Sequence, residues 1–136
     1  MEPSEEIIDK LAWIHIVDAQ ILCTRSEGQE KYAIPGGKRD LGETDTQALY
    51  RQIKQKLSAS IDIPSMRFIG IFEAQADGRK PGILTRLTCY SATHDGRLIP
   101  ASEVTEMVFL NYEDREMVTE VDTLIFDYLK EKEILK

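Results

Sequence analysis

A glycine-rich loop followed by a charged, helix-like segment gives this chain the residue types of a phosphate and magnesium site. Gly37 is followed by five residues, Glu43, seven residues and Arg51. Gly36, Gly37 and Gly42 let the loop adopt positive φ and bring backbone amides near a ligand. A loop of this kind that enters a helix N-terminus is an anion site, and a carboxylate such as Glu43 suits a hard divalent cation. The spacing therefore indicates chemistry on a phosphorylated ligand.

The segment after this loop has the pattern of an amphipathic helix over residues 44–57. Its apolar residues recur at every fourth position and have a small neighbour, as in Leu49, Ile53, Leu57 and Ala48. Thr44 or Asp45 can accept a hydrogen bond from the free amides of the first turn. We therefore expect a helix whose apolar stripe packs on a sheet.

The residues that follow Arg51 carry a family resemblance. They read Gln52-Ile53-Lys54-Gln55-Lys56-Leu57-Ser58-Ala59. With the spacing before it, this run resembles the Nudix box, G-x5-E-x7-R-E-U-x-E-E-x-G-U, in which U is a bulky aliphatic residue. Where the box has three glutamates after its arginine, this chain has Gln52, Gln55 and Lys56. The resemblance covers nearly the whole chain, because the predicted strands and helices also come in the order of that family.

The resemblance implies roles for residues of the loop and the helix. It makes Gly36 and Gly37 the backbone elbow and Glu43 the loop carboxylate. It makes Arg51 the residue that orients the neighbouring glutamates, or that pairs with Glu43 where those glutamates are absent. The remaining catalytic positions of the box are occupied by Gln52, Gln55 and Lys56.

Contacts to phosphate and metal are implied in the same way. Arg25 and Lys38 lie where Nudix proteins often contact phosphates, together with the glycine elbow. Glu73, on a strand that is otherwise apolar, faces either the ligand cleft or solvent. The expected magnesium ligands are the Gly36 carbonyl, Glu43, and Glu103 or Glu106 from a later acidic loop.

The replaced glutamates change the chemistry that the box can perform. Two amides and one ammonium in place of three carboxylates shift the charge of the site by about four units, so we expect very weak magnesium binding by the protein alone. Gln52 cannot accept a proton as a general base. Lys56 can neutralise phosphate charge, but it accepts a proton from water only if its pKa is strongly depressed.

The remaining segments predict an α/β fold. We expect a Nudix-like α/β/α sandwich in one domain, 1–136, with a mixed sheet between the box helix and a C-terminal helix. The predicted strands are 11–17, 20–25, 31–34, 65–73, 83–93 and 106–111, with a tight turn at 18–19. The C-terminal helix is expected over 119–132, with Val121, Leu124, Ile125, Tyr128 and Leu129 on its inner face.

Composition limits the possible partners. With 136 residues, 42% of them hydrophobic, the chain can bury one core. A net charge of −7 argues against a long nucleic acid as partner. We expect a cytoplasmic protein, because the acidic N-terminus is unlike a signal peptide and no apolar run approaches membrane-spanning length. Cys23 and Cys89 lie in apolar stretches without metal-site spacing, which predicts buried free thiols.

Histidine and aromatic residues give weaker signals. His15 and His94 have no catalytic partner at a suitable spacing, so we expect neither to be functional. Four aromatic residues at strand positions are candidates for stacking on a base, although most aromatics at this spacing belong to the core. They are Trp13, Tyr32, Phe72 and Tyr90.

Two hypotheses of different classes follow. The first is a small Nudix hydrolase that cleaves the pyrophosphate of a nucleoside diphosphate linked to another group, with Mg²⁺ carried largely by the substrate and held with help from Glu43 and Glu103 or Glu106. The second is a non-catalytic protein that binds a small nucleotide or another diphosphate-containing metabolite, as a sensor or partner subunit. We favour weak or absent magnesium-dependent hydrolysis, because three candidate bases and metal ligands are missing together. Deliberate replacement of the glutamates would give the same sequence.

Overall fold

Consecutive residues of the first strand belong to two different cores. In the computed structural model, which describes residues 6–136, strand β1 spans Glu6–Ile14. Leu11 and Trp13 pack with helix α1 (Asp45–Leu57), whereas Ala12 and Ile14 pack with helix α2 (Glu120–Glu131). Since side chains alternate between the faces of a strand, the unbroken apolar run 11–14 reflects a sheet that is covered on both faces.

The strands form one mixed sheet and two smaller antiparallel ones. The four-stranded sheet has the order β4–β1–β7–β6, in which β1 is parallel to β7 and antiparallel to β4. A three-stranded sheet has the order β2–β3–β9, and β5 pairs with β8. The further strands are β2 (Ile16–Val17), β3 (Gln20–Ser26), β4 (Gly36–Lys38), β5 (Ser60–Ile61), β6 (Arg67–Gln75), β7 (Ile83–Ser91), β8 (His94–Asp95) and β9 (Val104–Leu110).

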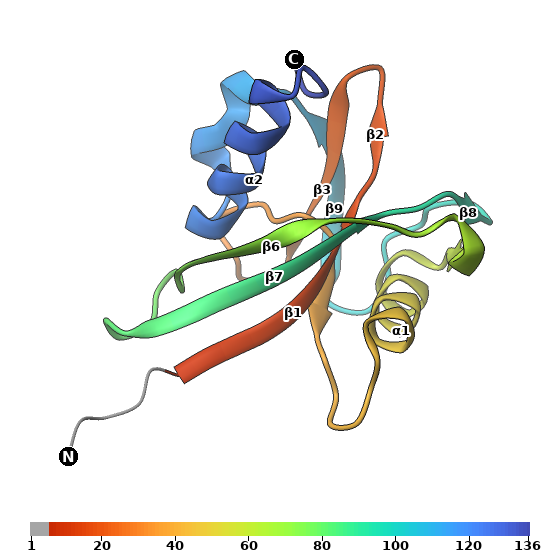
Figure 1. Ribbon diagram of the computed structural model, residues 1–136, viewed down its shortest axis with the longest axis horizontal. Helices are drawn as coiled ribbons and strands as arrows, with labels where there is room; N and C mark the ends of the chain where they lie inside the picture. Colours follow the sequence, from red (N-terminus) through yellow and green to blue (C-terminus); the bar gives the residue numbers. More distant parts are fainter. Residues whose placement is uncertain (1–5) are drawn as a thin grey trace.

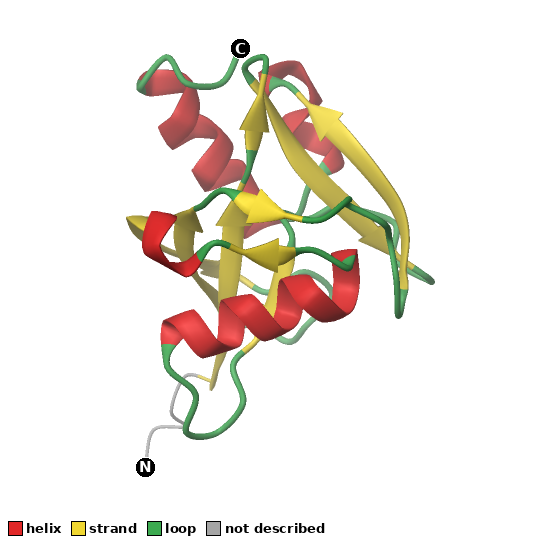
Figure 2. Ribbon diagram, turned by 90° about the vertical axis from the view of Figure 1, so that its right-hand side faces the viewer, coloured by secondary structure: helices red, strands yellow, loops and turns green. Residues whose placement is uncertain are grey.

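The helices lie on opposite sides of the long strands. Figure 1 shows β1, β7 and β6 side by side, with α2 on one side of them and α1 on the other. Figure 2, turned by 90°, shows one long helix in front of the strands and the other on their far side. Short 3-10 helices occupy Ile63–Ser65 and Tyr112–Met117. The predicted α/β/α arrangement with a mixed sheet is confirmed, and no helix of residues 6–136 is long and apolar enough to cross a membrane.

The predicted box helix is present and is capped at its expected start. Thr44 is the N-cap: its Oγ1 accepts from the Gln47 amide at 3.1 Å, and the Gln47 side chain accepts from the Thr44 amide at 2.9 Å. The helix ends at Ser58, which has φ 62°. The four residues predicted for the apolar stripe, Ala48, Leu49, Ile53 and Leu57, have no exposed surface.

Some element boundaries differ from the prediction. The strand predicted over 11–17 is two strands, because the chain passes from the four-stranded sheet to the three-stranded sheet at His15. The strand predicted over 31–34 is wrong: Tyr32 and Ala33 form only isolated bridges, to Val118 and Thr24. The tight turn at 18–19 is confirmed, with positive φ at both residues. The two long antiparallel strands predicted after the box helix are confirmed as β6 and β7.

The C-terminal helix is confirmed with a different inner face. Val121, Ile125 and Leu129 are buried as predicted, but Leu124 is 39% exposed. Phe126 is fully buried in its place, and Tyr128 packs against Phe72 of β6 with ring centroids 5.6 Å apart. The helix is therefore rotated relative to the predicted stripe, and this rotation also buries Asp122.

Candidate functional site

The glycine elbow has its conformation because β4 lies close to two neighbours. Gly36 faces Ala12 and Gly37 faces Leu11 in the antiparallel pairing of β4 with β1. A Cβ on Gly36 would collide with the carbonyl oxygen of Leu11, and the φ of Gly36 is +151°. A Cβ on Gly37 would lie 2.5 Å from Cδ of Gln52. Side chains are therefore excluded from both positions, and the backbone of the loop lies directly against α1.

Gln52 acts as a hydrogen-bond donor beneath this elbow. Its side chain is buried, and its Nε2 donates to the carbonyl oxygen of Lys38 at 2.9 Å. An ionised carboxylate at this position could not donate and would face the carbonyl dipole directly. The amide thus stabilises the loop in a way that a glutamate could not without a cation between the two oxygens.

Lys56 contacts two of the oxygens that the sequence predicts as magnesium ligands. Its Nζ donates to the carbonyl oxygen of Gly36 at 2.7 Å and lies 3.5 Å from Oε1 of Glu103. An ammonium has three N–H donors, so these two contacts leave one donor for a ligand. The protein therefore supplies one positive charge of its own between oxygens that would otherwise suit a metal.

Glu43 is bound by Arg51, which confirms the predicted ion pair. Nε of Arg51 lies 2.7 Å from one carboxylate oxygen of Glu43, and Nη2 lies 2.8 Å from the other. The amide of Asp40 donates to the same carboxylate at 2.8 Å. These bonds, that to Arg51 first, lower the pKa of Glu43 to about 2. Gln55 is exposed and accepts from Arg51 at 3.4 Å.

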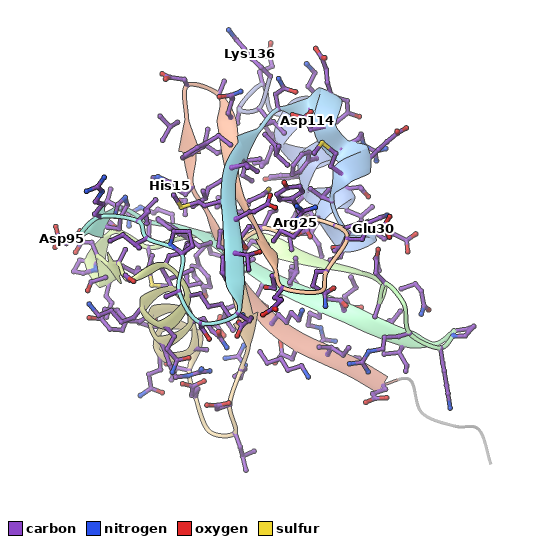
Figure 3. The ribbon with its side chains drawn as sticks, turned by 180° about the vertical axis from the view of Figure 1, so that it is seen from behind. His15, Arg25, Glu30, Asp95, Asp114 and Lys136 are labelled. Atoms are coloured by element: carbon purple, nitrogen blue, oxygen red, sulfur yellow. The ribbon has the colours of Figure 1, made fainter. Side chains whose placement is uncertain are left out.

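The last predicted metal ligand, Glu106, is also bound by the protein. Its carboxylate accepts from the Tyr32 hydroxyl at 2.5 Å and forms an ion pair with Arg25 across the β3–β9 pairing. The hydrogen bond from Tyr32, followed by that from Arg25, lowers the pKa of Glu106. In Figure 3 Arg25 lies on the α2 side of its strand, away from the box helix. The partner of Arg25 is thus the carboxylate of Glu106 on the neighbouring strand β9.

The side chains present do not fit a magnesium ion. Within residues 6–136, each expected oxygen ligand is bound to a basic group of the protein, and no cluster of three or more histidine, cysteine or acidic side chains is suited to a metal. A hard cation needs several anionic oxygens. Here Glu43, Glu103 and Glu106 lie in three separate ion pairs.

A pocket of about 400 Å³ lies beside the elbow, between β1, β4 and the start of α2. It brings together five of the residues predicted from the sequence: Gly36, Gly37, Lys38, Lys56 and Glu103. Arg25, Glu43, Arg51, Gln52, Gln55, Glu73 and Glu106 do not line it. Glu73 is exposed and binds Arg86 at 2.5 Å, as expected for its solvent-facing alternative.

Sequence reasoning missed six charged residues that line the pocket, and two of them, Lys10 and Asp122, are not exposed. Lys10 lies in the otherwise apolar second half of β1, and its Cα faces that of Lys38 in β4. Asp122 lies in α2 and is 1% exposed. Lys10 directly follows Asp9, and Asp122 lies two residues after Glu120, so neither charge stood out from its neighbours in the sequence.

Asp122 is held in a low-polarity environment with two hydrogen bonds. Its carboxylate accepts from the Thr119 hydroxyl at 2.5 Å and from the Ile34 amide at 3.5 Å. Burial raises its pKa to about 7, and the two hydrogen bonds oppose part of that effect. The carboxyl group is therefore partly protonated near neutral pH.

The candidate stacking aromatics do not line this pocket. Trp13 is fully buried, and its Nε1 donates to the carbonyl oxygen of Ala92 at 3.1 Å. It stacks on His15, with ring centroids 4.5 Å apart, and His94 completes this aromatic cluster. The histidines therefore pack with a core tryptophan. The two cysteines are buried free thiols, as predicted.

Comparison with known proteins identifies the fold. No family model and no curated protein sequence matches the chain. The MutT protein from Methanosarcina mazei Go1 is similar in structure with a TM-score of 0.77, over 97% of this chain and 99% of that chain, at 12% identity. The MutT NUDIX hydrolase from Burkholderia pseudomallei gives 0.75, over 90% and 98%, at 15% identity. The E. coli ORF135 protein gives 0.71, over 92% and 91%, at 19% identity. The chain therefore has the Nudix fold.

Proposed function

We propose that this protein binds a small nucleotide or another diphosphate-containing metabolite without magnesium, and that its magnesium-dependent hydrolysis is weak or absent. The single observation that carries this proposal is the position of the Lys56 ammonium, 2.7 Å from the Gly36 carbonyl oxygen. There it supplies the positive charge that a metal ion would bring to a phosphate. The proposed setting is the cytoplasm.

The charge of the pocket supports an anionic ligand. Its basic residues outnumber its acidic ones, and one of the acidic residues, Asp122, has a pKa raised to about 7. The whole chain carries a net charge of −7, so the excess of basic residues in the pocket is opposite in sign to the charge of the chain. The basic residues are Lys10, Lys31, Lys38, Lys56 and Arg79, and the acidic ones are Glu27, Asp77, Glu103 and Asp122.

The missing catalytic groups support weak or absent hydrolysis. Gln52 cannot remove a proton from water, and Arg51 holds Glu43 with a pKa of about 2, which makes Glu43 a very weak base. An ammonium also lacks the capacity of a metal ion to ionise a bound water. Binding can therefore persist while the chemical step is slow.

Calorimetric titration with inorganic pyrophosphate and a panel of nucleotides tests the proposal. Each titration is run with magnesium and with a chelator, and phosphate release is measured on the same samples. We expect binding in the chelator without release. Lys56→Met should weaken pyrophosphate binding by about tenfold. The matched control is Lys54→Met, because Lys54 is exposed on the same helix and does not line the pocket.

Binding that requires magnesium and is followed by release of phosphate would overturn the proposal. It would favour the hydrolase alternative, in which Glu43 and Glu103 or Glu106 replace the missing box glutamates. Equal effects of the Lys56 and Lys54 substitutions would separately exclude Lys56 as the phosphate ligand.

A further inference from the structure

Lys10 is a cation inside the pocket that has no ionic partner in the described part of the chain. It forms no salt bridge within 4.0 Å and no side-chain hydrogen bond with residues 6–136. By contrast, Lys31 of the same pocket lies 3.7 Å from Asp77, and Lys56 is bound to Gly36 and Glu103. A partly buried ammonium without a partner is less stable than one that pairs with an anion.

The surroundings of Lys10 add to this cost. Burial, and then the positive charge of Lys56, lower the pKa of Lys10, and Lys38 and Arg79 act in the same direction. Asp122 is the acidic group that opposes them, and its own pKa is raised to about 7. Lys10 on β1 and Lys56 at the elbow are therefore two neighbouring cations of one pocket.

The lining of the pocket disfavours a nucleobase. Its apolar members are all aliphatic, and no phenylalanine, tyrosine or tryptophan side chain lines it. Bases are commonly bound by stacking on aromatic rings, which contributes about 1–3 kcal/mol per base in single-stranded nucleic acid complexes. A base in this pocket would meet charged, hydroxyl, amide and aliphatic groups instead of an aromatic ring. An anionic group would compensate the charge of Lys10.

We propose that Lys10 binds a second anionic group of the ligand, so that the pocket takes a compact aliphatic metabolite with an anionic group at each end instead of a nucleotide. Lys56 binds the phosphate at the elbow, and Lys10 binds the other group, which is either a carboxylate or a second phosphate. This inference rests on the phosphate contact of Lys56 in the proposed function, and it goes beyond that function by admitting a ligand with a single phosphate.

A matched set of three ligands tests it. Glycerol 3-phosphate and 3-phosphoglycerate differ in that a hydroxymethyl group replaces a carboxylate, and glycerol 1,3-bisphosphate carries a second phosphate on that hydroxymethyl group. All are titrated calorimetrically in a chelator at one ionic strength. We expect at least one of the doubly anionic compounds to bind about tenfold more tightly than glycerol 3-phosphate. Whichever of the two binds more tightly identifies the second group.

The variant Lys10→Met assigns that preference to one side chain. It keeps the length of the side chain and removes the charge, so we expect the preference to fall below about twofold, with a smaller loss in the affinity for glycerol 3-phosphate. Lys10→Arg keeps the charge and should retain part of the preference. Lys132→Met is the control, because Lys132 is exposed beyond the end of α2. Thermal unfolding establishes that each variant is folded.

Failure of this inference is distinguishable from failure of the proposed function. An unchanged preference in folded Lys10→Met, or tighter binding of nucleoside diphosphates than of both doubly anionic compounds, overturns the role of Lys10 and leaves that of Lys56 intact. No binding of these compounds, of pyrophosphate or of any nucleotide overturns both proposals.

Discussion

Arg51 binds both carboxylate oxygens of Glu43, at 2.7 and 2.8 Å, and so connects the middle of α1 to the loop that precedes it. The same guanidinium donates to the carbonyl oxygen of Lys38 at 3.0 Å. One side chain therefore holds both ends of the 38–43 loop. With three box glutamates absent, Arg51 has a structural role that does not depend on a metal.

This ion pair should make the stability of the protein sensitive to acid. The folded-state pKa of Glu43 is about 2, against an ordinary value of 4.5. A lowered pKa contributes stability above the ordinary value, and this contribution is lost as the pH falls from about 4.5 towards 2. We expect Glu43→Gln to lower the melting temperature at pH 6 and to have less effect at pH 3. A difference that stays constant over this range would contradict the assignment.

Asp122 should have the opposite pH dependence. Its pKa is raised from 3.8 to about 7, so the folded state retains a proton that the unfolded state releases. Stability from this group is present below about pH 4 and is lost as the pH rises through about 7. We expect Asp122→Asn to become progressively more stable than the parent protein between these values. Chemical denaturation of both proteins at several pH values measures this difference in unfolding free energy. A difference that does not change with pH would exclude a raised pKa of Asp122.

Restoring the box glutamates should restore part of the chemistry. We expect Gln52→Glu, Gln55→Glu and Lys56→Glu together to raise magnesium-dependent pyrophosphatase activity by at least about a hundredfold. A carboxylate at position 52 would face the Lys38 carbonyl without a donor, so the triple variant should also gain thermal stability from magnesium. The single variant Lys56→Glu is the comparison. A folded triple variant that binds magnesium and shows no gain would indicate that the pocket does not align a pyrophosphate.

The packing of α1 gives a prediction that is independent of ligands. Ile53 is fully buried between α1 and the four-stranded sheet, so Ile53→Ala should cost about 2–5 kcal/mol of unfolding free energy. Leu41, in the loop before α1, is fully exposed, and Leu41→Ala should change stability by less than about 0.5 kcal/mol. Chemical denaturation of the two variants makes the comparison. Similar losses of unfolding free energy in the two variants would mean that Leu41 packs against the rest of the protein in solution.

Local patterns predicted most of the fold, and the exceptions have physical causes. The spacing of Leu49, Ile53 and Leu57 and the cap at Thr44 depend on neighbouring residues alone, and both predictions are confirmed. The change of sheet at His15 depends on which strands pair, and no local pattern records that. The rotation of α2 that exposes Leu124 is likewise set by tertiary packing.

The site was less predictable, because its contacts join distant segments. Lys56 and Gly36 are twenty residues apart, and Arg25 and Glu106 are eighty-one residues apart. Five of the predicted residues line one pocket beside the glycine elbow, but the sequence did not indicate which carboxylates would be bound by basic side chains. Lys10 was missed because one lysine in a strand has no spacing signature.

Because the Lys56 ammonium is covalently attached to α1, the elbow carries a counterion that cannot dissociate. A phosphate would then bind in one step, without the ordered arrival of a metal and an anion. Its affinity would follow the anion concentration alone and would not change with the free metal level in the surroundings. The single charge of the ammonium would also limit how strongly the ligand's phosphorus is polarised. The presence of Lys56 in place of a metal ion would thus make phosphate binding simpler and leave the bound phosphate less reactive.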